Sequence, residues 1–247
     1  MGSFFNAILI QPLLNTLVFL YEYVSFQDLG IAIILLTIVI RVILYPLFYK
    51  SLHNQSMMQK IQPEIEKVRH EHKDNKEKQA QVLMELYRTH KVNPFMGFLL
   101  ILIQLPILIS LYHVILKGFT LESFSNLYSF ITPPAVLNHS LLGLIDLQQS
   151  SIVIVGLAAI LQYFQGKLAL PKKSGDAKGE ESPAAKVGRQ MVFIGPILTL
   201  LILNSLPGAV GLYWATTSAF SIVQQIIVNK TLYKEYGGDK TNNSKNS

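Results

Sequence analysis

Arg41 is the residue of this sequence whose chemistry most needs an explanation, because it lies inside a long apolar run. The run covers residues 29–49 and contains no other charged side chain. A guanidinium keeps its proton, so it cannot escape an apolar environment by becoming neutral. The usual compensation is a carboxylate, yet the other long apolar runs of the chain contain no Asp or Glu. Arg41 is therefore expected to be hydrated or to bind an anion that another molecule supplies.

Further polar side chains recur inside the other apolar runs. Gln104 is near the middle of one run, and a polar stripe below Trp214 follows the three- and four-residue spacing of one helix face in the last run. A single Ser or Thr is readily explained as a hydrogen bond between helices. The set as a whole favours a hydrated, cationic groove that is open to the cytoplasm and closed towards the outside. Its candidate residues are Arg41, Thr37, Gln104, Gln162, Gln165, Trp214, Thr217, Ser218, Ser221, Gln224 and Gln225.

Several kinds of chemistry are excluded or disfavoured by the residues that the sequence lacks. There is no cysteine, which rules out disulfides, thiolate metal sites and a cysteine nucleophile. Neither a P-loop nor an HExxH motif occurs. The only His inside an apolar run, His113, is close to the outer end, far from a mid-depth Ser–His pair. We expect no enzyme activity, no metal and no cofactor.

The elements that position these residues are expected to be membrane-spanning helices. The chain is 50% hydrophobic and 15% charged, whereas a soluble domain carries about 25% charged residues. A helix of about 20 residues crosses the hydrocarbon core. We predict an all-α integral membrane protein with a five-transmembrane-helix core. Its segments are an N-terminal extracytoplasmic interfacial helix (1–28), span 1 (29–49), a cytoplasmic helical hairpin (50–92), span 2 (93–116), an extracytoplasmic loop (117–150), span 3 (151–170), a cytoplasmic linker (171–189), spans 4 and 5 (190–206 and 209–228) and a cytoplasmic tail (229–247).

The distribution of basic residues predicts the orientation of the spans. Lys and Arg are absent from residues 1–28, numerous in 50–92, nearly absent from 117–150, and numerous again in 171–189. Because basic segments stay in the cytoplasm, we expect a multi-pass membrane protein with its N-terminus outside and its C-terminus inside. The net charge of +6 is then a topology signal, and DNA is not an expected partner.

The polar segment after the first span has two competing interpretations. Met57, Met58 and Met84 are soft, adaptable apolar groups on the predicted hairpin. They either pack the hairpin itself or form a yielding surface that receives client helices. In the preceding span, Pro46 predicts a bend near the inner end.

Four stretches of the sequence resemble the YidC/Oxa/Alb family of membrane protein insertases over about residues 29–230. They are Arg41-x-x-x-Tyr45-Pro46-Leu47, SMMQKIQPEIEKVR, KVNPFMGFLLILIQLPILISLY and GLYW…IVQQ. The resemblance implies a five-helix core with a groove open to the cytoplasm and to lipid. It matches Arg41 to the groove arginine, Gln104 to the glutamine of the second span, either Gln162 or Gln165 to a third-span glutamine, and Trp214 to an aromatic of the fifth. Ser218 departs from the Asn of many members.

The resemblance implies a membrane protein insertase or chaperone of the bacterial plasma membrane. Nascent hydrophobic segments would enter the groove from the cytoplasm and leave into the lipid bilayer beside the third and fifth spans. Nascent membrane protein clients and the bilayer are the expected partners, with the ribosome and the Sec translocon as further candidates. The alternative is a channel or transporter component that uses Arg41 as an anion site, although no inverted repeat is apparent. A purely structural assembly factor is a third possibility.

Overall fold

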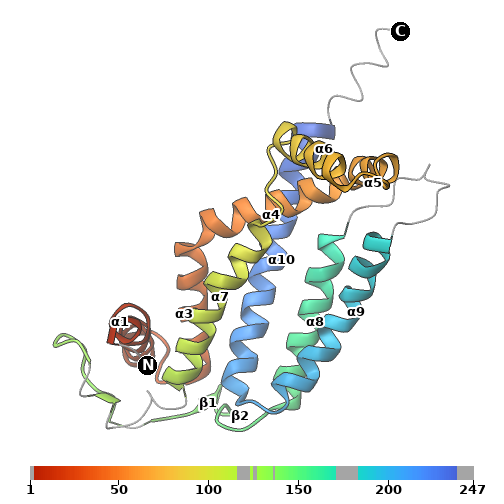
Figure 1. Ribbon diagram of the computed structural model, residues 1–247. Coiled ribbons are helices and arrows are strands. Elements are labelled where there is room, and N and C mark those ends of the chain that lie inside the picture. The colour runs from red at the N-terminus through yellow and green to blue at the C-terminus, as the bar shows by residue number, and fades with distance from the viewer. Residues whose placement is uncertain (1–2, 116–122, 125–126, 136, 171–182, 238–247) are drawn as a thin grey trace.

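The computed structural model describes residues 3–115, 123–124, 127–135, 137–170 and 183–237, and these residues are mostly helical (Figure 1). The helical elements are α1 (Ser3–Phe5), the π-helical segment η1 (Asn6–Ile10), α2 (Gln11–Tyr23), α3 (Leu29–Ile43), α4 (Tyr45–Lys60), α5 (Gln62–Glu71), α6 (Lys76–Thr89), α7 (Met96–His113), α8 (Ile152–Ala169), α9 (Pro183–Leu203) and α10 (Gly208–Gly237). Two short strands, β1 (Ser140–Leu141) and β2 (Ile145–Asp146), form an antiparallel hairpin.

The first apolar run is divided between two helices. Asp28 caps α3 by accepting a 2.8 Å hydrogen bond from the backbone N–H of Ile31, and α3 ends at Ile43. After Leu44 the chain continues as α4, bent by 70° from α3. The break at Leu44 thus lies within the segment predicted as span 1 (29–49), near its inner end. The expected bend is present but begins before Pro46, which occupies the first turn of α4, where its missing N–H leaves no hydrogen bond unmade.

Two helices of the described residues, α7 and α8, are long and apolar enough to cross a membrane. The bent pair α3–α4 can form a third crossing, and residues Arg189–Leu203 of α9 form a shorter apolar helix. The all-α membrane class is confirmed, whereas the division into five spans stays a prediction. In Figure 1, α3, α7, α10, α8 and α9 run in broadly the same direction.

α10 is the central helix of this bundle. It packs against α8 along one side and against α3 and α4 along the other, while α9 packs mainly on α8. Close contact between α8 and α10 depends on Gly211, because a Cβ there would lie 3.0 Å from Cγ2 of Ile154. These two helices and the end of α9 share an apolar cluster, which consists of Val155, Ala158, Leu203, Val210 and Ala215.

The N-terminal helical segment from α1 to α2 crosses the direction of the bundle and is seen end-on at the lower left of Figure 1. Its buried side chains include Leu17, Val18 and Tyr21, which belong to the same core cluster as Ala32 and Ile33 of α3. Residues 1–28 are thus helical from Ser3 to Tyr23. Their location at the membrane interface stays a prediction.

The segment 137–149, expected to be loop, instead joins several helices at one end of the bundle. The backbone N–H of Asn138 donates to the Tyr21 hydroxyl at 2.7 Å, and that of Leu142 donates to the Asp28 carboxylate. The backbone N–H of Gly208 donates to the carbonyl of Gln149 at 2.8 Å. Segment 137–149, which contains the β-hairpin, therefore connects α2, α3 and α10.

The opposite end carries the helical pair α5 and α6, which meet at a turn over residues 72–75. An apolar cluster joins this pair to α4 and to the end of α10. It consists of Leu52, Met57, Ile61, Ile65, Val92, Val228 and Leu232.

Two helices in the last third of the chain extend beyond the segments predicted as spans. α9 begins at Pro183, inside the segment predicted as linker, while residues 171–182 lie outside the described ranges. α10 continues to Gly237, beyond the predicted end of the fifth span at residue 228, so the first part of the predicted tail is helical.

Candidate functional site

A cavity of about 400 Å³ lies between the helices of the bundle. Helices α3, α4, α7, α8, α9 and α10 all contribute to its wall. Its lining residues are Arg41, Phe48, Leu52, Gln55, Leu100, Gln104, Gln162, Gln165, Gly166, Ala169, Met191, Val192, Pro196, Trp214, Thr217, Ser218, Ser221 and Gln225. The lining contains one charged residue, Arg41, and no Asp or Glu. The cavity is therefore cationic and otherwise lined by neutral polar and apolar groups.

Arg41 is buried in the wall of this cavity, with 5% of its surface exposed. Its guanidinium carbon lies 4.0 Å from the centroid of the Phe48 ring, a cation–π contact. No Asp or Glu of the described residues forms an ion pair with it, and its Nη1 atom has no hydrogen-bond partner. A charged donor that is buried and only partly satisfied is suited to bind an incoming anion.

Gln162 connects three helices. Its Oε1 atom accepts a 3.0 Å hydrogen bond from Nε1 of Trp214 on α10 and another from the hydroxyl of Thr199 on α9. Gly195 leaves room for this amide, because a Cβ there would lie 3.1 Å from Nε2 of Gln162. Gln165 also lines the cavity, one turn further along α8. Both third-span glutamines therefore contact the cavity.

Most residues of the polar stripe of α10 line the cavity, and one, Gln224, does not. Thr217, Ser218 and Ser221 line the cavity. Gln225 does so too, and its Nε2 atom donates to Ser56 Oγ of α4 at 3.0 Å. Gln224 lies outside the lining and is 1% exposed, with no hydrogen-bond partner for its amide atoms.

One other predicted groove residue, Thr37, also lies outside the cavity lining. It is buried, and its hydroxyl donates to the Ile33 carbonyl of the same helix at 2.7 Å. The remaining predicted groove residues all line the cavity. Their assignment to client binding stays a proposal.

A family model described as 60Kd inner membrane protein matches residues 19–235 of the chain. The chain belongs to this family. It is similar to membrane protein insertase YidC of Nitratidesulfovibrio vulgaris, with 33% identity over 224 residues, which cover 89% of this chain and 38% of the relative. Membrane protein insertase YidC of Geobacter metallireducens is 30% identical over 226 residues, which cover 92% of this chain and 38% of that relative. The chain thus spans about 38% of the length of these relatives.

These matches confirm the resemblance to the YidC/Oxa/Alb family. Together with the apolar helices α7 and α8, they make the chain a multi-pass protein of a bacterial membrane. The orientation with the N-terminus outside and the C-terminus inside stays a prediction.

In this protein, an apolar core fills the end of the bundle that carries the β-hairpin. Ile33 and Leu36 of α3, Leu111 of α7 and Leu147 beside the β-hairpin are all almost completely buried in one cluster. On the opposite side, the lining includes Leu52 and the exposed Gln55 of α4. The cavity wall therefore extends towards the α5–α6 end.

The predicted hairpin methionines lie in different environments. Met57 is buried in the cluster that joins α4 to α10, and Met58 packs partly buried against it. Met84 on α6 is 64% exposed. Ordinary packing therefore accounts for Met57, whereas Met84 remains accessible to another molecule.

Two residues next to Arg41 were missed by sequence reasoning. The ring of Phe48, which lies beyond the bend after Leu44, contacts the guanidinium. Tyr213 is buried on α10, and its hydroxyl accepts a hydrogen bond from the amide of Gln104. The sequence shows that Tyr213 immediately precedes Trp214. It does not show that the Tyr213 hydroxyl faces Gln104 of α7.

Proposed function

We propose that this chain is a membrane protein insertase, which receives nascent hydrophobic segments in the cavity and releases them into the bilayer. The observation that carries the proposal is Arg41, a buried cation without an acidic partner among the described residues, in a cavity whose lining has no carboxylate. The relatives' printed name, membrane protein insertase YidC, supports it. Because an insertase forms and breaks no covalent bond, the expectation of no enzyme activity agrees with this function.

The proposed orientation puts α5 and α6 in the cytoplasm and the β-hairpin outside. Basic residues support it, since they are numerous in 50–92 and nearly absent from 117–150. An acidic or polar client tail then enters from the cytoplasm and is attracted by Arg41. A membrane potential that is negative inside drives an anionic client tail outwards. It contributes about 2.3 kcal/mol per elementary charge per 100 mV.

The sequence predicted release into lipid beside the third and fifth spans. Those helices, α8 and α10, pack closely along their length, with Val155 and Ala158 buried between them. α7 and α9 instead line the cavity with Leu100, Met191 and Pro196, and their outer faces are apolar and exposed. We propose release between α7 and α9. Burial of client apolar surface in lipid, at about 25 cal/mol per Å², drives the step without ATP.

The partners of this function are nascent membrane protein clients and the bilayer, with the ribosome and the Sec translocon as proposed further partners. The α5–α6 pair faces the cytoplasm in this orientation. Of the three methionines proposed to receive clients, Met84 is the exposed one.

The groove mechanism requires the charge of Arg41 more than its planar donor geometry.

The direct test is insertion into vesicles that contain the purified protein. Arg41→Ala should reduce insertion of a client with an acidic tail at least tenfold, while Arg41→Lys should keep most of it because the charge is retained. Lys167→Ala is the matched control, since Lys167 is an exposed cation at the end of α8 outside the cavity lining. Normal insertion of acidic-tailed clients by Arg41→Ala would contradict the mechanism.

A cysteine-labelling experiment separates the insertase from the channel or transporter component. The chain has no cysteine of its own, so Ser221→Cys in the cavity and Ile33→Cys in the packed core can be probed singly. With a membrane-impermeant thiol reagent, an insertase should label Ser221→Cys from the cytoplasmic side alone and Ile33→Cys from neither side. Labelling of both positions from the outside would favour the channel.

A further inference from the structure

Two neighbouring loops at the β-hairpin end hold bulky apolar residues in a left-handed backbone conformation. Phe26, between α2 and α3, has φ 54° and is 95% exposed. Leu142, in the β1–β2 turn, also has φ 54° and is 65% exposed, and Leu144 beside it is 84% exposed. Bulky side chains rarely adopt this conformation. Two such residues lie at the same end of the molecule, and both expose apolar side chains. Strained backbone of this kind indicates a functional role.

The surrounding structure maintains both conformations. In the first loop, the backbone N–H of Gln27 donates to the Tyr21 carbonyl at 3.1 Å, and that of Asp28 donates to the Ser25 carbonyl at 3.0 Å. In the second loop, the N–H of Leu142 donates to the carboxylate of the buried Asp28. Asp28 therefore joins the two loops, so that the apolar tips Phe26, Leu142 and Leu144 belong to one rigid end of the protein.

The tips are continuous with a surface that is suited to lipid. The candidate span α8 begins at Ile152, a few residues after β2, and Ile152 and Val153 are 70% and 66% exposed. The backbone bond from Gly208 to the Gln149 carbonyl keeps the start of α8 at the same end as the β-hairpin. The tips thus lie near the level at which the hydrocarbon layer begins.

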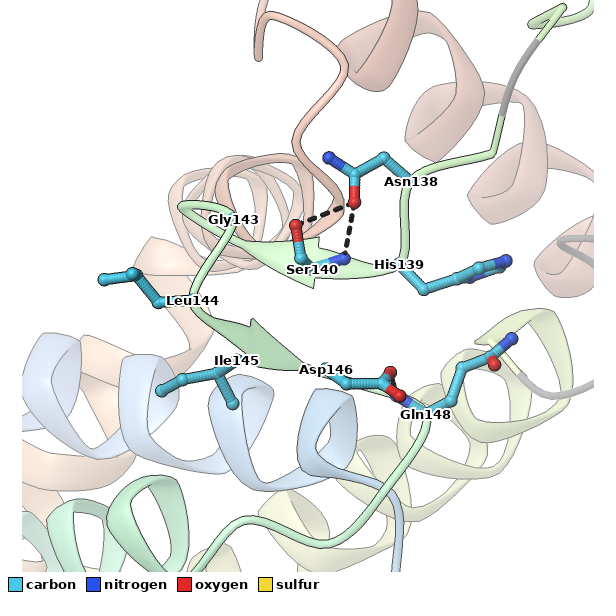
Figure 2. Close-up of a pocket in the computed structure, with 8 residues that line it drawn as sticks. All are labelled: Asn138, His139, Ser140, Gly143, Leu144, Ile145, Asp146 and Gln148. Atoms are coloured by element: carbon cyan, nitrogen blue, oxygen red, sulfur yellow. Dashed lines mark hydrogen bonds between the residues drawn. The ribbon is translucent and has the colours of Figure 1, made fainter.

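The charge and shape of the tips favour lipid over a protein surface. Residues 140–145 contain no charged side chain, and the one charge in residues 23–28 is the buried Asp28. In Figure 2, Leu144 projects from the turn away from the side on which His139, Asp146 and Gln148 gather. Single apolar side chains on protruding turns are suited to enter a fluid layer, whereas a protein partner would require a contiguous complementary face.

We propose that Phe26, Leu142 and Leu144 form an interfacial anchor, which inserts among phospholipid acyl chains just below the headgroups of the adjoining leaflet. This anchor rests on the membrane-spanning character of the chain and not on the proposed insertase activity. Its consequence concerns Arg41, which lies thirteen residues beyond Asp28, about 20 Å along the helix. Because the anchor is rigidly joined to the cap of α3, it sets the depth of the cationic site.

The test uses single cysteines labelled with an environment-sensitive nitrobenzoxadiazole dye in the full chain. The variants are Phe26→Cys and Leu144→Cys, with Gln148→Cys as the matched control, since Gln148 is exposed on the same segment. The protein is placed in vesicles of phosphatidylcholine and phosphatidylglycerol that carry a nitroxide either at acyl carbon 5 or on the headgroup. An unchanged unfolding midpoint of each labelled variant shows that it is folded.

For Phe26→Cys and Leu144→Cys we expect quenching by the acyl-chain nitroxide at least twofold greater than for Gln148→Cys, together with a blue-shifted emission. Equal quenching at all three positions overturns the anchor. Protection of the tips from aqueous iodide without quenching by either lipid also overturns it, and shows instead that protein covers them. Either failure leaves the Arg41 insertion experiment unaffected, so the two proposals are tested separately.

Discussion

The guanidinium carbon of Arg41 lies 4.0 Å from the centroid of the Phe48 ring, although seven residues of straight helix would span about 10 Å along the axis. The 70° bend between α3 and α4 closes this distance. The same α4 continues towards the α5–α6 pair through Leu52 and Met57, which pack in the cluster that joins α4 to α10. The cation of the cavity therefore contacts a helix that also belongs to the opposite, polar end of the molecule.

A double-mutant cycle should detect the contact between Arg41 and Phe48. Phe48→Leu removes the ring face while keeping an apolar side chain, and Arg41→Met removes the charge. We expect a coupling energy of about 0.5–2 kcal/mol, the range of cation–π pairs from exposed to desolvated sites, measured by unfolding in detergent micelles. Phe48→Tyr is the control and should retain the coupling. Additive effects of Phe48→Leu and Arg41→Met would show that the ring and the cation do not interact.

Gln162 should matter more for stability than Gln165, although both line the cavity. Gln162→Leu leaves Nε1 of Trp214 and the hydroxyl of Thr199 without their shared acceptor. At about 0.6 kcal/mol per interhelical hydrogen bond in a membrane protein, the expected loss is about 1 kcal/mol. Because Trp214 is the only tryptophan, its fluorescence maximum should shift in Gln162→Leu and stay unchanged in Gln165→Leu. Identical behaviour of the two variants would contradict the role of Gln162.

A side chain at Gly30 should destabilise the protein, because α3 and the β-hairpin lie too close together there. A Cβ at this position would lie 2.7 Å from Cβ and 3.0 Å from Cα of Leu141, so the hairpin backbone would have to move. We expect Gly30→Ala to lower stability by about 1–3 kcal/mol, as for other overpacked sites. Gly97→Ala in α7 is the control, because a Cβ there meets no heavy atom within 4 Å. A thermal unfolding midpoint for Gly30→Ala as high as that of Gly97→Ala would refute the close approach.

His139 should make stability depend on pH. Burial lowers the pKa of His139 below its ordinary value, and the neighbouring Asp146 carboxylate partly opposes this effect. The folded state therefore favours the neutral ring. Its contribution to stability is complete above a pH of about 6.5, the ordinary value, and is lost as the pH falls below 6.5 through the lower pKa of the folded state.

Unfolding midpoints measured between pH 8 and pH 5 would check this dependence. His139→Asn should lose less stability than the unsubstituted protein as the pH falls below 6.5. Asp146→Asn should lose more, because the carboxylate no longer favours the protonated ring. Parallel pH profiles for His139→Asn and the unsubstituted protein would show that another group causes the dependence.

Several features of this protein were determined by the sequence alone, because they depend on residue type and spacing. A guanidinium in an apolar run without a carboxylate needs a polar environment wherever its helix lies, and Arg41 does line a cavity. The three- and four-residue periodicity of α10 put Thr217 and Ser221 on one face, and both reach that cavity. The turn after α5 was similarly predictable, because the apolar period is interrupted locally by polar residues over 72–75.

Only the tertiary structure decided the features that depend on contacts between distant segments. Pro46 predicted a bend, but the packing of α4 against α10 and α7 sets its direction and thereby brings Phe48 over Arg41. The periodicity of α10 could not separate Gln225, which bonds Ser56, from Gln224, whose amide is buried without a partner. Helical spacing defines a face to within about one residue, whereas the neighbour that each side chain meets depends on how the other helices cross it.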